Sequence, residues 1–213
     1  GVKIMSLDMN RATNNSRRRK IIALGDPGHT TVLLSSNFIP LNIGFIASYL
    51  KSKFGDEIEI HLFKDPEEIR SFAINSRPDL IALSNYAWNQ VLSLHLLKDY
   101  KLANPEGVAI MGGPNFPKDE SRANDWLLSH PHVDFIVENE GETSMEALVS
   151  RLFEKDFSLI DAKAEPISGC FFVDHEKNLA HAPCDMLKDL NDIPSPYLEG
   201  WFDHFLLKDV KGF

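Results

Sequence analysis

A regular alternation of short apolar runs with longer amphipathic stretches, along residues 20–155, constrains the fold more than any other feature of the sequence. The short runs have the length of a β-strand and end at turn-forming residues. The longer stretches repeat apolar residues at helical spacing. Strands that alternate with helices build βαβ units, which form a parallel sheet with helices on both faces. The pattern therefore predicts a doubly wound, Rossmann-like α/β domain with a mostly parallel sheet of about five strands.

Individual elements can be assigned from their periodicity and their ends. Asp65 and Pro66 favour a helix start, because Asp is a good N-cap and Pro suits the first helical position. Two apolar runs, 80–84 and 108–111, read as strands buried on both faces. We expect strands at 21–24, 57–63, 80–84, 108–111 and 135–137, and helices at 41–54, 66–76, 90–103, 122–129 and 143–154.

The period changes near residue 160. Two strand-like runs, 167–173 and 178–182, flank a polar turn and predict a hairpin. A linker with two prolines at 191–197 and a weakly helical aromatic piece at 201–207 follow. The expected organisation is an N-terminal tail at 1–19, a Rossmann-like domain at 20–160, and a hairpin and linker at 161–213.

Composition narrows the function classes. The 213-residue chain carries a formal net charge of −9 and has a pI of about 5.3. Surfaces that bind nucleic acid are basic, so we expect no nucleic-acid partner. No apolar run of about 18 residues is present, so no membrane-spanning helix is expected. The two cysteines, Cys170 and Cys184, cannot hold an iron–sulfur cluster or a structural zinc alone. Such low cysteine use fits a cytoplasmic location.

The loops at one edge of the predicted sheet are the best place for a ligand. In open α/β sheets, ligands bind outside the carboxyl ends of the strands, where the strand order reverses. Gly112 and Gly113 follow a strand and remove side chains where a ligand or a backbone must come close. Gly141 allows a ligand to approach a helix N-terminus. Ser84 ends a buried strand, where its hydroxyl either meets a ligand or caps its own loop.

The same loops carry aromatic residues but no catalytic set. Tyr86 and Trp88 either cover a flat ligand face or pack on top of the sheet. No nucleophile with a base, no phosphate-binding glycine loop and no acid pair is visible, so we predict no catalytic residues and no metal ligands. We interpret the turn at 26–29, which contains Asp26 and His29, as a polar loop, and Cys170 as a core residue.

Five short motifs occur in an order that resembles a known family. They are Pro40–Leu50, Ser84-Asn85 after a strand, Gly112-Gly113-Pro114, Glu140-Gly141-Glu142 and the linker motif Ile193–Tyr197. Together they resemble the N-terminal cobalamin (B12)-binding domain of B12-dependent radical SAM enzymes. In that family the linker leads into a domain that carries a CxxxCxxC motif, a [4Fe–4S] cluster and S-adenosylmethionine. No such motif is present here. The resemblance implies the cobalamin module of a longer protein, either a methyltransferase or a related radical enzyme.

The resemblance also implies where cobalamin binds. The corrin would lie over the carboxyl edge of the sheet, with its nucleotide tail in a slot beside Ser84 and Gly112-Gly113 and with Gly141 near the end of the tail. The turn at 26–29 departs from the D-x-H-x-x-G motif, so no axial histidine is predicted. The partner would be the protein's own radical SAM domain, with a small-molecule or peptide substrate. The cofactor-binding residues that we expect are Ser84, Asn85, Trp88, Gly112, Gly113, Pro114, Glu140 and Gly141.

Two other function classes compete with cobalamin binding. The chain could be a degenerate Rossmann-like interaction domain that has lost cobalamin and only packs on a catalytic partner. That reading predicts a rim plugged by Tyr86, Trp88 or Phe116. A stand-alone enzyme such as a nucleotide-sugar transferase would need a phosphate-gripping loop or a metal-binding acid pair, and neither is visible.

Overall fold

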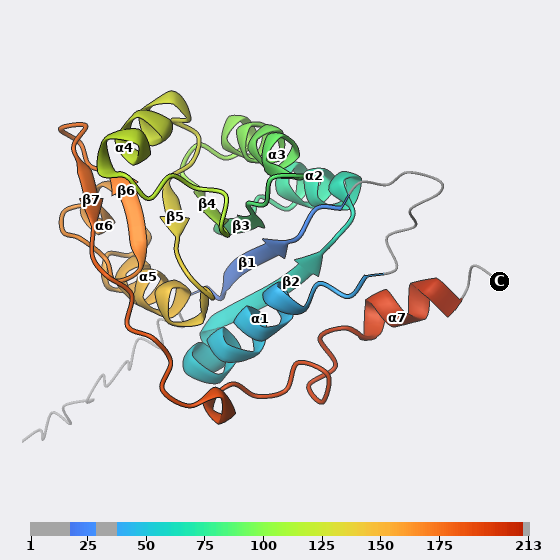
Figure 1. Cartoon of the computed structure of the whole chain (residues 1–213). Helices are drawn as coiled ribbons and strands as arrows, with labels where there is room; N and C mark the ends of the chain where they lie inside the picture. The colour runs from blue at the N-terminus through green and yellow to red at the C-terminus, as the bar shows by residue number, and fades with distance from the viewer. Residues whose placement is uncertain (1–17, 29–37, 211–213) are drawn as a thin grey trace, which may run out of the picture.

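The computed structural model describes residues 18–28 and 38–210. Within these residues the chain forms a seven-stranded sheet with the order β2-β1-β3-β4-β5-β6-β7 (Figure 1). The first five strands are parallel and the last two are antiparallel. The predicted α/β class and the mostly parallel sheet are confirmed. The strands are β1 Lys20–Gly25, β2 Ile58–Phe63, β3 Leu80–Ser84, β4 Val108–Gly112, β5 Phe135–Val137, β6 Cys170–Val173 and β7 Leu179–His181.

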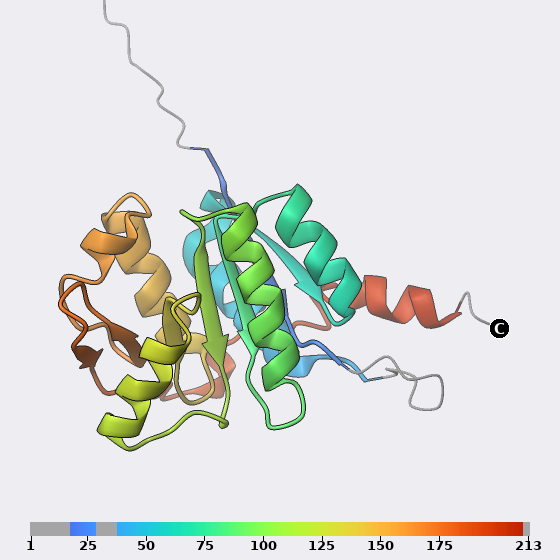
Figure 2. The same cartoon turned by 90° about the horizontal axis from the view of Figure 1, so that it is seen from above.

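Helices cover both faces of the sheet, as predicted. One face packs against α1 (Leu41–Phe54) and α5 (Glu142–Glu154). The other face packs against α2 (Pro66–Asn75), α3 (Gln90–Ala103) and α4 (Glu120–Ser129), which lie in front of the strands in Figure 2. Two separate clusters of buried apolar side chains form the core, one on each face. The expected helices differ from these bounds by at most two residues at either end.

The strand order reverses beside β1. The chain leaves β1 through α1 to reach the edge strand β2, and then returns through α2 to β3 on the other side of β1. Helices α1 and α2 therefore lie on opposite faces (Figure 1). Such a reversal leaves a crevice at the carboxyl ends of the strands, since the flanking connections diverge there.

Local sequence explains the start of α2. Asp65 Oδ1 accepts hydrogen bonds from the backbone N–H groups of Glu67 (2.8 Å) and Glu68 (3.0 Å), and Pro66 takes the first helical position. The two bonds satisfy amide groups that have no partner within the helix, which is how an N-cap stabilises a helix start. The predicted Asp65 cap is confirmed.

The predicted hairpin is present and belongs to the main sheet. Strand β6 pairs antiparallel with β5, with Val137 opposite Cys170, and β7 pairs with β6. Cys170 is fully buried, as predicted for a core residue. Because the hairpin extends the sheet of five parallel strands to seven, hydrogen bonding runs across the boundary that we placed at residue 160. A short helix, α6 (Leu159–Ala162), precedes the hairpin and was not predicted.

The C-terminal segment returns along α1. It contains a 3₁₀ turn, η2 (Leu190–Asp192), and a short α-helix, α7 (Asp203–Val210). Another 3₁₀ turn, η1 (Gly55–Glu57), directly follows α1. The ring of Phe202 is buried against α1, where a Cβ on Gly44 would overlap it. The predicted helical piece at 201–207 begins two residues later than expected.

Parts of two predictions lie outside the described residues. The N-terminal tail is outside up to residue 17, and the turn at 26–29 is outside at His29. Among the described residues, no helix is long and apolar enough to cross a membrane.

Candidate cofactor-binding site

A cavity, called the slot from here on, opens at the carboxyl ends of the parallel strands between α1 and α5. Its cavity volume is about 80 Å³. Its position beside the strand reversal agrees with the general rule for open α/β sheets. The lining residues are Leu24, Asn42, Ile43, Ile46, Ala82, Leu83, Ser84, Tyr86, Ile110, Gly112, Gly113, Val137, Asn139, Glu140, Gly141 and Met145.

The slot brings together most of the predicted binding residues. They come from the ends of β3 and β4 and from the loop that leads into α5, which are far apart in the sequence. Five of the eight line the slot: Ser84, Gly112, Gly113, Glu140 and Gly141. The other three, Asn85, Trp88 and Pro114, are not among its lining residues.

The floor of the slot reaches the surface of the sheet. Ala82 is the middle residue of β3 and remains partly exposed, whereas its neighbours Ile81 and Leu83 are only 1% and 2% exposed. Helices α1 and α5 therefore leave the sheet uncovered at Ala82. The side chains around this opening are apolar: Leu24, Ile43, Ile46, Ile110, Val137 and Met145.

Glycines keep the upper part of the slot clear. Gly141 has φ +97°, and a Cβ there would lie 3.0 Å from Ile46 Cδ1 and 3.9 Å from Val137 Cγ1, which are two walls of the slot. A Cβ on Gly112 would meet no atom closer than 3.6 Å. The packing of the protein itself therefore does not require glycine at 112, and the room beside it belongs to the slot.

Gly113 has a different reason for being glycine. Its φ is +134°, and a Cβ would lie 2.7 Å from the carbonyl oxygen of Asn85. The loops after β3 and β4 approach each other here, and Asn85 joins them. Its backbone N–H donates to the Gly112 carbonyl (2.6 Å) and its side-chain amide donates to the Asn115 carbonyl (2.9 Å). Asn85 thus holds the two loops together from below the rim, without lining the slot.

A polar network fixes the loops after β1 and β3. Ser84 Oγ donates to Asp26 Oδ1 (2.5 Å) and accepts from the Asn89 side-chain amide (2.8 Å). Burial raises the pKa of Asp26 above its ordinary value, while hydrogen bonds from Ser84 and Asn42 act in the opposite direction. The Ser84 hydroxyl is therefore engaged with Asp26 and Asn89. It neither points freely at a ligand nor caps only its own loop, so neither of our two readings of Ser84 describes it fully.

The aromatic residues of the rim divide between wall and surface. Tyr86 lines the slot, and Trp88 stacks on it with ring centroids 4.5 Å apart and planes 4° apart. Trp88 is 63% exposed and reaches the slot only through Tyr86. Contact between Trp88 and the cofactor stays a prediction; in the structure Trp88 contacts Tyr86, which lines the slot.

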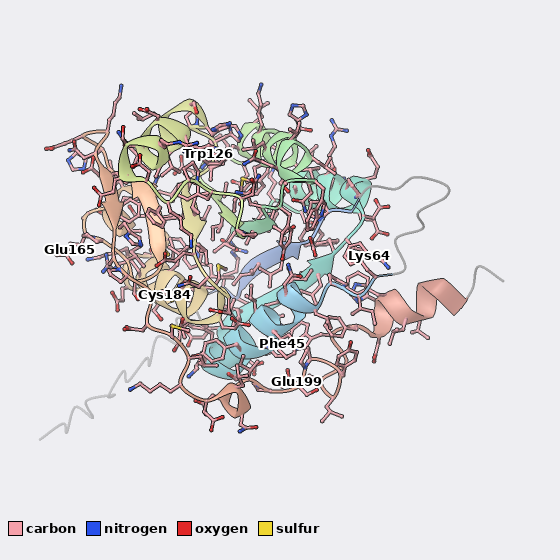
Figure 3. All side chains as sticks on the ribbon, viewed as in Figure 1. Phe45, Lys64, Trp126, Glu165, Cys184 and Glu199 are labelled. Atoms are coloured by element: carbon pink, nitrogen blue, oxygen red, sulfur yellow. The ribbon has the colours of Figure 1, made fainter. Side chains whose placement is uncertain are left out.

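Phe116 does not plug the slot. Its ring packs on Trp126 and Phe171, with both pairs of centroids 5.3 Å apart, on the face covered by α4. Figure 3 shows Trp126 on that side of the sheet and Phe45 of α1 on the other. Pro114 lines a separate hollow on the Phe116 side. The slot beside Gly112 and Gly113 is thus open, contrary to what a degenerate domain plugged by its own side chains predicts.

Sequence reasoning missed the helical walls of the slot. Asn42, Ile43 and Ile46 lie in the first turns of α1, and Met145 lies in the first turn of α5. The usable signal was their position: residues in the first two turns of a helix, on the face toward the sheet, lie at the carboxyl edge of the sheet.

Comparison with known proteins agrees with this geometry. A sequence profile described as the B12 binding domain matches residues 31–149, which is more than half of the chain. The chain belongs to the B12-binding domain family. The matched residues include β2 to β5, all of α1, the part of α5 up to Val149 and every predicted binding residue. The cofactor after which this family is described, B12, is cobalamin.

Curated relatives of this B12-binding domain are methyltransferases. It is 27% identical over 175 residues to the 2-(S-pantetheinyl)-carbapenam-3-carboxylate methyltransferase of Streptantibioticus cattleyicolor, covering 78% of this chain and 24% of that protein. It is 28% identical over 195 residues to the cobalamin-dependent radical SAM methyltransferase TokK of Streptomyces tokunonensis, covering 88% and 26%. The chain thus spans about a quarter of the length of these relatives.

A solved structure has the same fold. The B12-binding domain superposes on the cobalamin-dependent S-adenosylmethionine radical enzyme OxsB, with aqua-cobalamin and S-adenosylmethionine bound, at a TM-score of 0.64 and 17% identity. The match covers 88% of this chain and 26% of OxsB. At this identity the likeness establishes the fold.

Proposed function

We propose that this domain holds cobalamin over the carboxyl edge of its sheet, with the nucleotide tail of the cofactor in the slot. The slot that reaches the sheet at Ala82 carries this proposal. A flat heterocycle needs a narrow opening lined by small residues, which Gly112 and Gly141 supply near the rim and Ala82 supplies at the floor. The buried, apolar lining suits the hydrocarbon part of such a ring.

The residues that would hold the tail act by shape. Ile43 and Ile46 of α1 face Val137 and Met145 across the slot, and Gly113 together with Asn85 keeps the rim loops close together. Asp26, Ser84 and Asn89 fix the loops beneath the rim by hydrogen bonds among themselves. Of the predicted residues outside the lining, Trp88 supports Tyr86 and Asn85 joins two loops, so we assign both a positioning role.

We further propose that the domain is one module of a longer radical SAM protein, in which a separate domain binds a [4Fe–4S] cluster and S-adenosylmethionine. The two methyltransferase relatives, of which the chain spans about a quarter, support this. Cobalamin supplies methyl-transfer chemistry when it is bound, and the protein supplies binding and orientation. The module would not be catalytic alone, and its two free cysteines fit a cytoplasmic protein.

Binding by the 213-residue chain tests the siting of the tail. We expect hydroxocobalamin and methylcobalamin to remain with the protein through desalting, measured by corrinoid absorbance. Ala82→Leu fills the floor of the slot and should abolish this retention. Ala180→Leu is the matched control, because Ala180 is also partly buried in a strand, β7, but lies away from the slot.

The two variants separate the possible outcomes. Equal retention by wild-type protein and Ala82→Leu would show that the tail does not enter the slot. Release of both corrinoids from the wild-type protein would instead support the competing reading, a domain that has lost cobalamin and only packs on its partner. Circular dichroism of both variants checks that the fold is intact.

A further inference from the structure

We infer that the slot selects corrinoids by the base of their nucleotide tail, and that it accepts a benzimidazole base in preference to adenine. The inference rests on the proposed function, because it assumes that the tail enters the slot. It concerns the chemistry at the floor of the slot, where side chains from four strands and two helices surround Ala82.

The floor offers hydrocarbon on every side. Leu24, Ile110, Val137 and Met145 are each at most 3% exposed, so the walls close tightly around the partly exposed Ala82 and a base seated there would displace the water above it. Every side chain that lines the slot around Ala82 is apolar. A polar atom placed there would therefore find neither a side-chain partner nor bulk solvent.

The polar groups nearest to the floor are already engaged. Ser84 Oγ donates to Asp26 and accepts from Asn89. The Asn42 carbonyl oxygen accepts from the backbone N–H of Ile43 (2.9 Å), and its side chain also bonds to Asp26. The remaining polar lining residues are Asn139 and Glu140, which are exposed at the mouth of the slot, and Tyr86, which is half-buried at the rim beneath Trp88. The hydrogen-bonding side chains thus hold the rim together or face solvent.

The two bases differ in what they would present to this floor. The outer edge of a dimethylbenzimidazole carries only C–H and methyl groups. The corresponding edge of adenine carries an amino donor and ring-nitrogen acceptors. Burying those polar groups without partners weakens binding, while burying methyl groups strengthens it. We therefore expect the adenine-bearing corrinoid to bind at least about tenfold more weakly than cobalamin.

A panel of three corrinoids tests the inference on the 213-residue chain. The probes are cobalamin, the cobamide whose lower base is adenine, and cobinamide, which lacks the nucleotide tail. Dissociation constants come from absorbance titration in one buffer. Cobalamin should bind at least about tenfold more tightly than the adenine cobamide, and both should bind more tightly than cobinamide.

A single hydroxyl in the floor should reduce the discrimination. Val137→Thr keeps the shape of the side chain and adds a hydrogen-bonding group to the slot, so the ratio of the two dissociation constants should move toward one. Val108→Thr is the matched control, because Val108 is equally buried in the same core cluster but does not line the slot. Ala82→Ser, at the partly exposed floor position, repeats the test with less risk to folding.

Each outcome decides the matter. Equal affinity for cobalamin and the adenine cobamide, both above that for cobinamide, would overturn the base selectivity and leave the siting of the tail intact. Equal affinity for all three corrinoids would overturn the selectivity and the siting together. No binding of any corrinoid would overturn cobalamin binding itself, and the selectivity with it.

Discussion

Ser84→Ala should destabilise the domain in a way that depends on pH. The substitution removes the hydroxyl that donates to Asp26 at 2.5 Å and leaves the carboxylate partly buried with weaker support. Hydrogen bonds to charged groups contribute about 1.5–3 kcal/mol and neutral ones about 0.5–1.5 kcal/mol. We therefore expect Ser84→Ala to lower the free energy of unfolding by about 2–3 kcal/mol at pH 8 and by less at pH 4.5.

The sign follows from proton linkage. Burial raises the folded-state pKa of Asp26 above the ordinary value of 3.8, so the folded protein binds this proton more tightly than the unfolded chain. The contribution of Asp26 to stability is therefore fully present below about pH 3.8 and is lost as the pH rises through the folded pKa. The hydrogen bond from Ser84 lowers the folded-state pKa of Asp26, so its removal in Ser84→Ala raises that pKa further. The variant therefore loses more stability than the wild-type protein as the pH rises.

Urea unfolding followed by circular dichroism at pH 4.5 and pH 8 measures the difference. Ser93→Ala is the control, because Ser93 Oγ donates to the neutral Ser84 carbonyl (2.8 Å) and its loss should cost about 1 kcal/mol at both pH values. A loss for Ser84→Ala that is the same at both pH values would refute the reasoning. So would a double variant with Asp26→Asn whose effects simply add.

Three further substitutions test other parts of the fold by urea unfolding. Phe202→Ala removes a ring that is 1% exposed against Gly44 and should cost about 3–5 kcal/mol, whereas Leu198→Ala, at a side chain 91% exposed in the same segment, should change stability by less than about 0.5 kcal/mol. Gly113→Ala should cost more than about 1 kcal/mol, because its Cβ would lie 2.7 Å from the Asn85 carbonyl at a φ of +134°; no loss would mean that the loops separate easily. Asp65→Ala should cost about 1 kcal/mol by removing the N-cap of α2, and an unchanged midpoint would contradict the capping role.

The sequence predicted the strands and their rim well, for a physical reason. Strands such as β3 and β4 are buried on both faces, so their apolar runs are continuous and their ends are sharp. Gly113 marks the rim because its φ of +134° and the nearby Asn85 carbonyl oxygen exclude a side chain, while Gly112 leaves room that belongs to the slot. The place of the hairpin was not predictable in the same way, since pairing between β5 and β6 depends on tertiary contact and leaves no local signal.

Side-chain roles at the rim were harder to predict than positions. Ser84 and Trp88 are both at the predicted edge, but the partner of each is another residue of the protein: Asp26 lies 58 positions before Ser84, and Tyr86 takes the face of Trp88. The walls were missed because a residue such as Ile46 repeats at helical spacing whether it faces the core or a cavity. Periodicity indicates which way a side chain points from its helix. Whether a cavity remains beside that side chain depends on the distance between α1 and α5, which the periodicity does not indicate.

Helix α1 is the element on which the slot and the C-terminal segment meet. Ile43 and Ile46 form one wall of the slot, while Gly44, in the same turn, leaves the notch that the ring of Phe202 fills. The sheet supports α1 from one side and Phe202 and Phe205 pack against the same core cluster. Because packed interiors transmit displacement rather than absorb it, the width of the slot depends on how the segment that contains Phe202 is seated. The wall position is therefore set jointly by residues from both ends of the domain, and the sheet alone does not determine it.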